Sequence, residues 1–128
     1  MSPQDRRRRL LLALPAVAYA ALILFLSSRP ASQLPSTGVP SGDKVLHLAE
    51  YFVFGALLVW PVLGWTWRGR GVALAAGIAY GAFDEAFQTL IPGRIGDVGD
   101  FAVDALGVAL AVALSVVVHP EPTAAKAR

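Results

Sequence analysis

Hydrophobic residues fall into four long runs along the chain, and short polar segments separate them. The first run covers residues 10–26, and the others extend from about 43 to 63, 72 to 91 and 101 to 118. A helix that crosses a bilayer needs about 17–25 predominantly apolar residues, and each run falls within that range. The pattern therefore predicts an all-α protein, a bundle of four transmembrane helices.

The segments between the runs have the composition of loops. Residues 27–42 are rich in Pro, Ser and Gly, Pro92-Gly93 follows the third run, and His119-Pro120 follows the fourth. Such residues end helices and favour turns. We therefore predict three parts: a basic amino terminus at residues 1–9, a membrane domain at 10–118, and a disordered tail at 119–128.

Composition agrees with a membrane protein. The chain has 128 residues, of which 55% are hydrophobic and 16% charged, and its mean hydropathy is +0.57. A small soluble domain is less apolar than this, so the expected partner is the lipid bilayer. The net charge of +2 reflects basic residues gathered near the predicted helix ends, so we expect no nucleic-acid binding. The absence of cysteine excludes disulfides and thiolate metal sites.

Arginine and tryptophan positions predict the orientation. Arg6–Arg9 precede the first run, and the segment Trp65–Arg70 joins the second to the third. Cytoplasmic loops are enriched in Lys and Arg, and tryptophans concentrate at membrane interfaces. We therefore predict that both termini and the 65–70 loop face the cytoplasm. The start of the second helix and the turn between the third and fourth would then face outward.

A basic start followed by an apolar run is also the pattern of a signal peptide. Here the run is followed by Ser27-Ser28-Arg29-Pro30, which is not a small-residue cleavage site. We expect the first helix to be retained.

Polar side chains gather around the predicted outer turn. An ionisable group in a bilayer costs several kcal/mol unless it faces a partner or water, which makes each one a candidate for function. At about 100° per residue, the polar positions of each helix share one stripe, and their depths overlap in one shallow cavity. Gly77-x-x-x-Gly81 lies on the Asp84 face and predicts close packing there. The gathered side chains are Asp84, Glu85, Gln88, Arg94, Asp97, Asp100 and Asp104, with His47 and Tyr51 on the second helix.

These residue types indicate several roles. Acid–base chemistry would use His47, Asp84 or Glu85, and a divalent cation would be held by His47, Asp84 and Asp104. Binding of a substrate would use Lys44, Tyr51, Gln88, Arg94 and Asp104.

Each candidate also has a structural interpretation. His47 and Tyr51 could sit at the interface and hydrogen-bond between helices. Glu85 could form a second cavity wall or pair with Lys44 or Arg94. Arg94 could bridge acids or bind a phosphate or carboxylate through its planar fork. Asp43 and Asp100 could cap the helices that begin there, and His119 could be an interfacial terminal residue without chemistry.

Three spaced motifs resemble the signature of the VanZ-like family, and the resemblance covers about residues 10–118. They are Asp43-Lys44-x-x-His47-x-x-x-Tyr51-x-x-x-Gly55, Asp84-Glu85-x-x-Gln88-x-x-x-Pro92-x-Arg94 and Asp100-x-x-x-Asp104-x-x-Gly107, preceded by the similar Leu26-Ser27-Ser28-Arg29-Pro30. The family usually has asparagine where Asp104 stands. The resemblance implies a bacterial cell-envelope membrane protein, of a family named after an accessory protein of glycopeptide (teicoplanin) resistance.

Two function classes follow. In the first, which we favour, the outer cavity binds an envelope precursor, lipid headgroup or antibiotic in an accessory role, without turnover. In the second, the protein is a membrane-embedded enzyme that uses acid–base or divalent-cation chemistry on a lipid-linked or anionic envelope substrate. A divalent cation is the one cofactor that these residues suggest. An ion path is disfavoured because no titratable residue continues through the third helix toward Val72.

Overall fold

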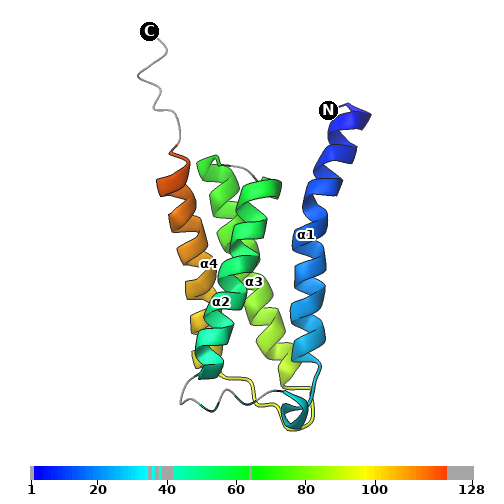
Figure 1. Ribbon diagram of the computed structural model, residues 1–128, viewed down its shortest axis with the longest axis vertical. Coiled ribbons are helices and arrows are strands. Elements are labelled where there is room, and N and C mark those ends of the chain that lie inside the picture. The colour runs from blue at the N-terminus through cyan, green and yellow to red at the C-terminus, as the bar shows by residue number, and fades with distance from the viewer. Residues whose placement is uncertain (1, 35, 37, 39–41, 64, 121–128) are drawn as a thin grey trace.

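The computed structural model describes residues 2–34, 36, 38, 42–63 and 65–120. Four α-helices make up most of it: α1 (Pro3–Ser27), α2 (Gly42–Leu57), α3 (Trp67–Gln88) and α4 (Val98–Val118) (Figure 1). A short 3-10 helix, η1 (Ala31–Gln33), follows α1, and a π-helical segment, η2 (Leu58–Leu63), continues α2. The described residues contain no strand. The predicted all-α fold with four helices is therefore confirmed.

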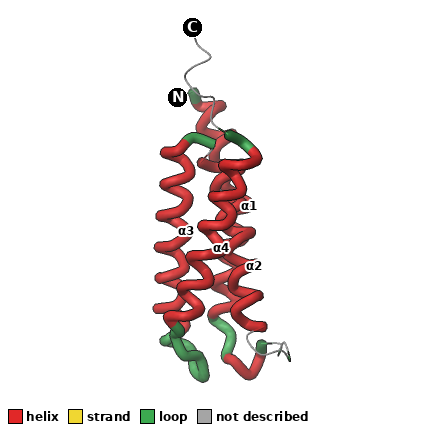
Figure 2. The backbone as a smooth tube through the Cα atoms, turned by 90° about the vertical axis from the view of Figure 1, so that its left-hand side faces the viewer, coloured by secondary structure: helices red, strands yellow, loops and turns green. Residues whose placement is uncertain are grey.

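The helices run lengthwise beside one another (Figures 1 and 2). The start of α1, the end of α4 and the connection from η2 to α3 lie at one end of the bundle, and the turn between α3 and α4 lies at the other. Helices α1 and α4 are long and apolar enough to cross a membrane. Helix α2 is shorter, at 16 residues, and α3 carries two buried carboxylates. Which end faces the cytoplasm stays a prediction.

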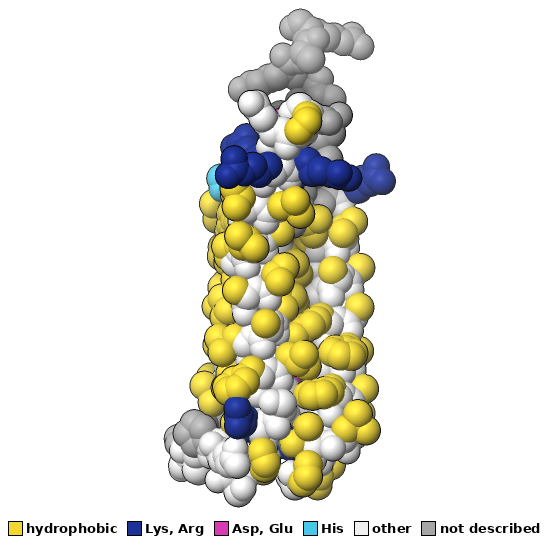
Figure 3. Space-filling view, turned by 90° about the vertical axis from the view of Figure 1, so that its right-hand side faces the viewer, with side chains coloured by type: hydrophobic (Ala, Val, Ile, Leu, Met, Phe, Trp, Pro, Cys, Tyr) yellow, Lys and Arg dark blue, Asp and Glu magenta, His cyan; other side chains and the backbone are white. Residues whose placement is uncertain are grey.

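The surface has the charge distribution expected of a membrane helix end. Lys and Arg side chains form a band near the end where α1 begins, and hydrophobic side chains cover the surface below that band (Figure 3). The amino-terminal half of α1 stands apart from the other helices (Figure 1), and Leu10, Leu14 and Val17 are exposed there. Lipid would cover these side chains in a bilayer.

Helix α1 begins earlier than the predicted residue 10. Ser2 caps it, because its side chain accepts a hydrogen bond from the Asp5 backbone N–H while the Asp5 carboxylate accepts one from the Ser2 backbone. This reciprocal capping box satisfies N–H groups that a helix start leaves unpaired. Arg6–Arg9 are consequently helical, so the first helix extends beyond the amino-terminal end of the predicted apolar run. The predicted tail falls largely on residues 121–128, which lie outside the described part of the chain.

The second and third helices also differ from their predicted bounds. The π-helical segment η2 contains Pro61, which has no N–H to donate to the preceding turn. Helix α3 begins at Trp67, where the Thr66 side chain accepts the Gly69 N–H at 3.0 Å. It ends at Gln88, and Gly93 then adopts a φ of 77°, a left-handed value that glycine tolerates without strain.

Arg70 was predicted in an exposed interfacial loop, and the structure contradicts this. Its side chain is 1% exposed. The guanidinium donates to Ser115 Oγ at 3.1 Å, to the Ser115 carbonyl at 2.9 Å and to the His119 carbonyl. The last carbonyls of α4 lack partners within the helix, and a cation there also suits the helix dipole. Arg70 therefore joins α3 to the end of α4, and His119, whose ring also stacks on Trp65, belongs to this contact.

Small residues set the distances between the helices. A Cβ on Gly107 of α4 would lie 2.6 Å from the Leu48 carbonyl oxygen and 2.9 Å from the Phe52 nitrogen, both backbone atoms of α2. A Cβ on Gly77 of α3 would lie 2.6 Å from the Val108 side chain on α4. The close packing predicted from Gly77-x-x-x-Gly81 is confirmed. Helix α4 thus packs closely against both α2 and α3.

We predict that Gly107→Ala destabilises the fold by about 1–3 kcal/mol, because the added methyl group meets rigid backbone. The measurement is the free energy of unfolding in detergent micelles. Gly71→Ala on α3 is the matched control. A Cβ there has no atom within 4 Å, so this variant should equal or exceed the parent in stability. Equal stability of the two variants would contradict the close approach of α2 and α4.

Candidate functional site

A histidine and a carboxylate from different helices meet at the end of the bundle where the turn between α3 and α4, predicted to be the outer turn, lies (Figure 1). His47 Nδ1 on α2 lies 2.9 Å from Asp104 Oδ1 on α4. The Asp104 side chain is fully buried and that of His47 is 16% exposed. Gly81 of α3 makes room for the pair, since a Cβ on Gly81 would lie 3.3 Å from Asp104 Cβ. The second oxygen, Asp104 Oδ2, has no hydrogen-bond partner among the described residues.

Asp84, one helical turn beyond Gly81, belongs to a separate polar group. Ser27 Oγ at the end of α1 donates to Asp84 Oδ2 at 2.7 Å, and Gln88 Nε2 donates to the same oxygen at 3.1 Å. All three residues are buried. A carboxylate buried in an apolar bundle needs such donors. This group therefore attaches α1 to α3, together with the hydrogen bond from Tyr80 Oη to the Ala20 carbonyl at 2.5 Å.

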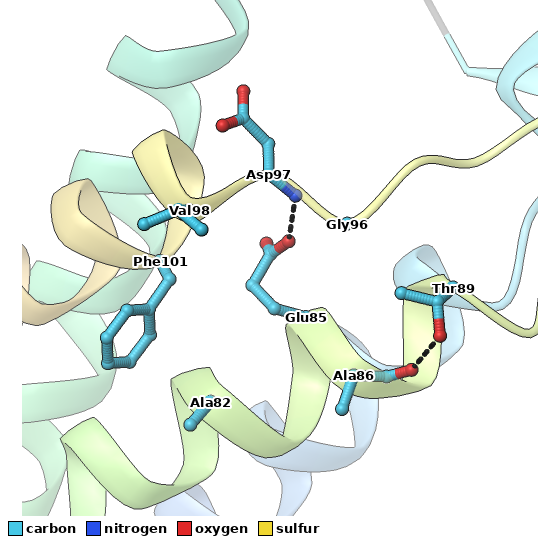
Figure 4. A pocket seen from close by; sticks show the side chains of 8 residues that line it. All are labelled: Ala82, Glu85, Ala86, Thr89, Gly96, Asp97, Val98 and Phe101. Carbon is cyan, nitrogen blue, oxygen red and sulfur yellow. Dashed lines mark hydrogen bonds between the residues drawn. The ribbon is translucent and has the colours of Figure 1, made fainter.

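Glu85 lies at the inner wall of a groove on the outside of the bundle. The groove encloses about 330 Å³ between α3, the outer turn and the start of α4. Figure 4 shows Glu85 reaching from α3 toward the outer turn, where its Oε2 accepts the Asp97 backbone N–H at 3.1 Å. Oε1 is buried without a partner. The remaining lining is mostly apolar, from Ala82, Ala86, Thr89, Gly96, Val98 and Phe101.

Lys44 fastens the outer turn to α2. Its ammonium lies 2.6 Å from Asp100 Oδ1 and 3.1 Å from Asp97 Oδ2. Asp97, not Asp100 as predicted, caps α4, because its side chain accepts the Gly99 N–H at 2.7 Å. The Gly99 N–H and the Lys44 ammonium both lower the pKa of the Asp97 carboxyl. The stabilisation that this ionised carboxylate gives is present above its ordinary pKa and is lost as the pH falls through the lowered value.

Five of the residues in these contacts belong to two hydrogen-bonded groups. His47 and Asp104 form one group, with ligand atoms of Glu85 and Asp100 near that of His47. Asp84 and Gln88 form the other with Ser27. The two lie close together, because Tyr51 is buried within electrostatic range of both Asp84 and Asp104.

Four further residues remain to be placed. Arg94 lies in the outer turn, and its side chain has no ion pair with any described residue. Asp43 lies inside the first turn of α2. Ser27 was assigned only to a loop, although it lies within the Leu26-Ser27-Ser28-Arg29-Pro30 segment of the family resemblance. Nothing in the sequence indicated that Arg70 is buried, because its position beside Arg68 and Trp67 matches an interfacial loop equally well.

Fold and site together define an all-α protein of membrane type, with a carboxylate–histidine site buried at one end of the bundle. A family model described as VanZ/LLP1 matches residues 9–119, and the chain belongs to that family. The expected membership is therefore confirmed over nearly the whole helical part. No curated protein and no solved structure matches the chain.

We predict that Ser27→Ala weakens the attachment of α1, because Asp84 loses its donor from that helix. Hydrogen bonds between membrane helices average about 0.6 kcal/mol and reach about 1.7. We expect the upper part of that range, since the acceptor is a buried carboxylate. Unfolding in detergent micelles measures it. Ser28→Ala is the control, since Ser28 Oγ bonds only the Phe25 carbonyl of its own helix. Equal effects of the two variants would show that the Ser27–Asp84 bond does not hold α1.

Proposed function

We propose that this chain is a multi-pass protein of a bacterial cell membrane, with both termini cytoplasmic and residues 10–118 as the membrane domain. In this proposal the groove at Glu85 faces the cell envelope and binds the headgroup of a lipid-linked envelope precursor. The role is accessory: the protein holds the precursor and lowers susceptibility to glycopeptides such as teicoplanin, which act on the envelope. Family membership and the two membrane-length helices support the setting.

The groove is the observation that carries the binding role. Its apolar lining suits the lipid part of a ligand at the bilayer surface. Glu85 and Asp97 offer acceptors to hydroxyl or amino groups of a headgroup. Arg94 supplies a positive charge for a phosphate, because Lys44 is already held by two carboxylates. The buried Tyr51, Gln88 and Asp104 would hold in place the helices that carry this groove.

A second candidate function is favoured by the His47–Asp104 pair. A carboxylate that holds one imidazole nitrogen leaves the other free to act as a general base, and this arrangement orients the base in many hydrolytic sites. The chain would then be an enzyme acting on the same envelope precursor, with Glu85 as the nearest further acid. An enzyme converts the bound precursor and an accessory protein returns it unchanged, so mass spectrometry of the recovered lipid separates the two.

We predict that Ala86→Trp, which fills the groove, returns the teicoplanin susceptibility of expressing cells to that of cells without the protein. The indole occupies the volume that the ligand needs, while Ala86 is exposed and its replacement disturbs no buried contact. Ala75→Trp is the control: it is equally exposed, lies on the same face of α3 and is about three turns away. Membrane abundance is measured for both. The proposal would be refuted if cells with the Ala86→Trp variant were as resistant as cells with the parent chain. It would also be refuted if the parent chain did not change the susceptibility of the cells.

We predict the orientation of the bundle from thiol labelling. The chain has no cysteine, so a single introduced thiol is the only one present. Ile95→Cys, in the outer turn at an 87% exposed position, should react with a membrane-impermeant reagent in intact cells. Arg68→Cys, exposed at the other end, should react only after the cells are opened. The reverse pattern would place the groove in the cytoplasm.

A further inference from the structure

Three side chains of the kinds that bind metals converge at the outer end of the bundle, from three different helices. One ligand atom each of His47 on α2, Glu85 on α3 and Asp100 on α4 lies within 4.8 Å of the others. Ligands around a transition-metal ion are about 3–4 Å apart, so small side-chain movements would close the set. The helices themselves fix this convergence, because the three residues are far apart in sequence.

Glu85 supplies an independent reason to expect a cation. Its side chain is only 7% exposed, and Oε1 has no hydrogen-bond partner among the described residues. Oε2 is already occupied by the Asp97 N–H. Leaving a buried carboxylate oxygen unpaired is destabilising, because the oxygen has lost its water and gained no partner. A cation between Glu85, His47 and Asp100 would remove that cost.

His47 is held in the manner of a metal-binding histidine. Asp104 Oδ1 lies 2.9 Å from Nδ1, which leaves Nε2 as the nitrogen available to a ligand. Histidines that bind metals commonly donate their other N–H to a carboxylate, which fixes the ring and raises its basicity. Because Asp104 presents a carboxylate and not a neutral amide, it makes this histidine a stronger donor to a metal.

Asp100 can accept a cation without losing Lys44. The Lys44 ammonium contacts Asp100 Oδ1, and Oδ2 makes no hydrogen bond to the described residues. Lys44 also lies 3.1 Å from Asp97, so it has a second carboxylate to neutralise.

We propose that His47, Glu85 and Asp100 form a divalent-cation site, with Asp104 as the residue that orients His47. One imidazole with two carboxylates suits Mn²⁺ better than Mg²⁺, which prefers oxygen ligands alone. The site differs from the set expected from sequence, since Glu85 and Asp100 take the places of Asp84 and Asp104 as direct ligands. It does not depend on the proposed binding of a precursor, because cation binding is measured on the purified chain.

The test uses the full chain in detergent, freed of metal and titrated with MnCl₂ while free Mn²⁺ is followed by electron paramagnetic resonance. We expect about one equivalent to bind, and echo-detected spectra to show ¹⁴N coupling from the imidazole. Glu85→Gln and His47→Gln should each weaken binding at least tenfold, and Asp104→Asn about 10–100-fold. Asp43→Asn is the control, because this exposed acid in the same helical turn as Lys44 is outside the ligand set.

Three results would overturn the proposal. The first is no Mn²⁺ binding by the parent chain. The second is Mn²⁺ that binds without ¹⁴N coupling or that Mg²⁺ displaces equally well. Either observation would mean a site elsewhere with oxygen ligands only, and both are made on the parent chain. The third is an equal loss of affinity in Asp43→Asn and Glu85→Gln. Size-exclusion profiles of the variants separate a lost ligand from a lost fold.

Discussion

The structure depends on one constraint: a carboxylate placed between apolar helices must find a partner on another helix. Asp104 meets His47, Asp84 meets Ser27, and Asp100 meets Lys44. In each of these pairs the two residues belong to different helices, although Asp84 also accepts from Gln88 of its own helix. Burying a charge without such a partner costs far more than any one apolar contact returns. The polar contacts therefore determine how the helices align lengthwise, and the glycines determine how closely they approach.

The two ends of the bundle meet this constraint differently. At the end where α1 begins, one buried cation, Arg70, donates to hydroxyl and backbone acceptors at the end of α4, and only its Nη1 lacks a partner among the described residues. At the other end the acids outnumber the available cations, and buried oxygens of Asp84, Glu85 and Asp104 have no partner among the described residues. A site with acceptors in excess is ready for a ligand that brings donors or positive charge. The end held by Arg70 contributes to the fold, and the end with acceptors in excess carries the candidate chemistry.

Sequence alone predicted the helices well, because apolar runs of membrane length are a strong signal. Helical phase also placed His47 and Asp104 on the polar stripes of their respective helices. What it missed were pairings that depend on rotation and tilt between helices. Nothing local distinguishes Asp84 as a partner of Ser27 from Asp84 as a partner of His47, since both lie at similar depth. Arg70 was missed for a related reason: positive charge near a helix end looks the same whether it faces water or the end of another helix.

The pairings also have a consequence for how the protein is made. Ser27 and Asp84 are 57 residues apart, as are His47 and Asp104. A ribosome releases the helices in order, so Asp84 can find its partner as soon as α3 is inserted, whereas His47, Lys44 and Arg70 must wait for α4. Until the last helix arrives, His47, Lys44 and Arg70 lack the partners that α4 and the turn before it supply, and the last helix then covers these groups.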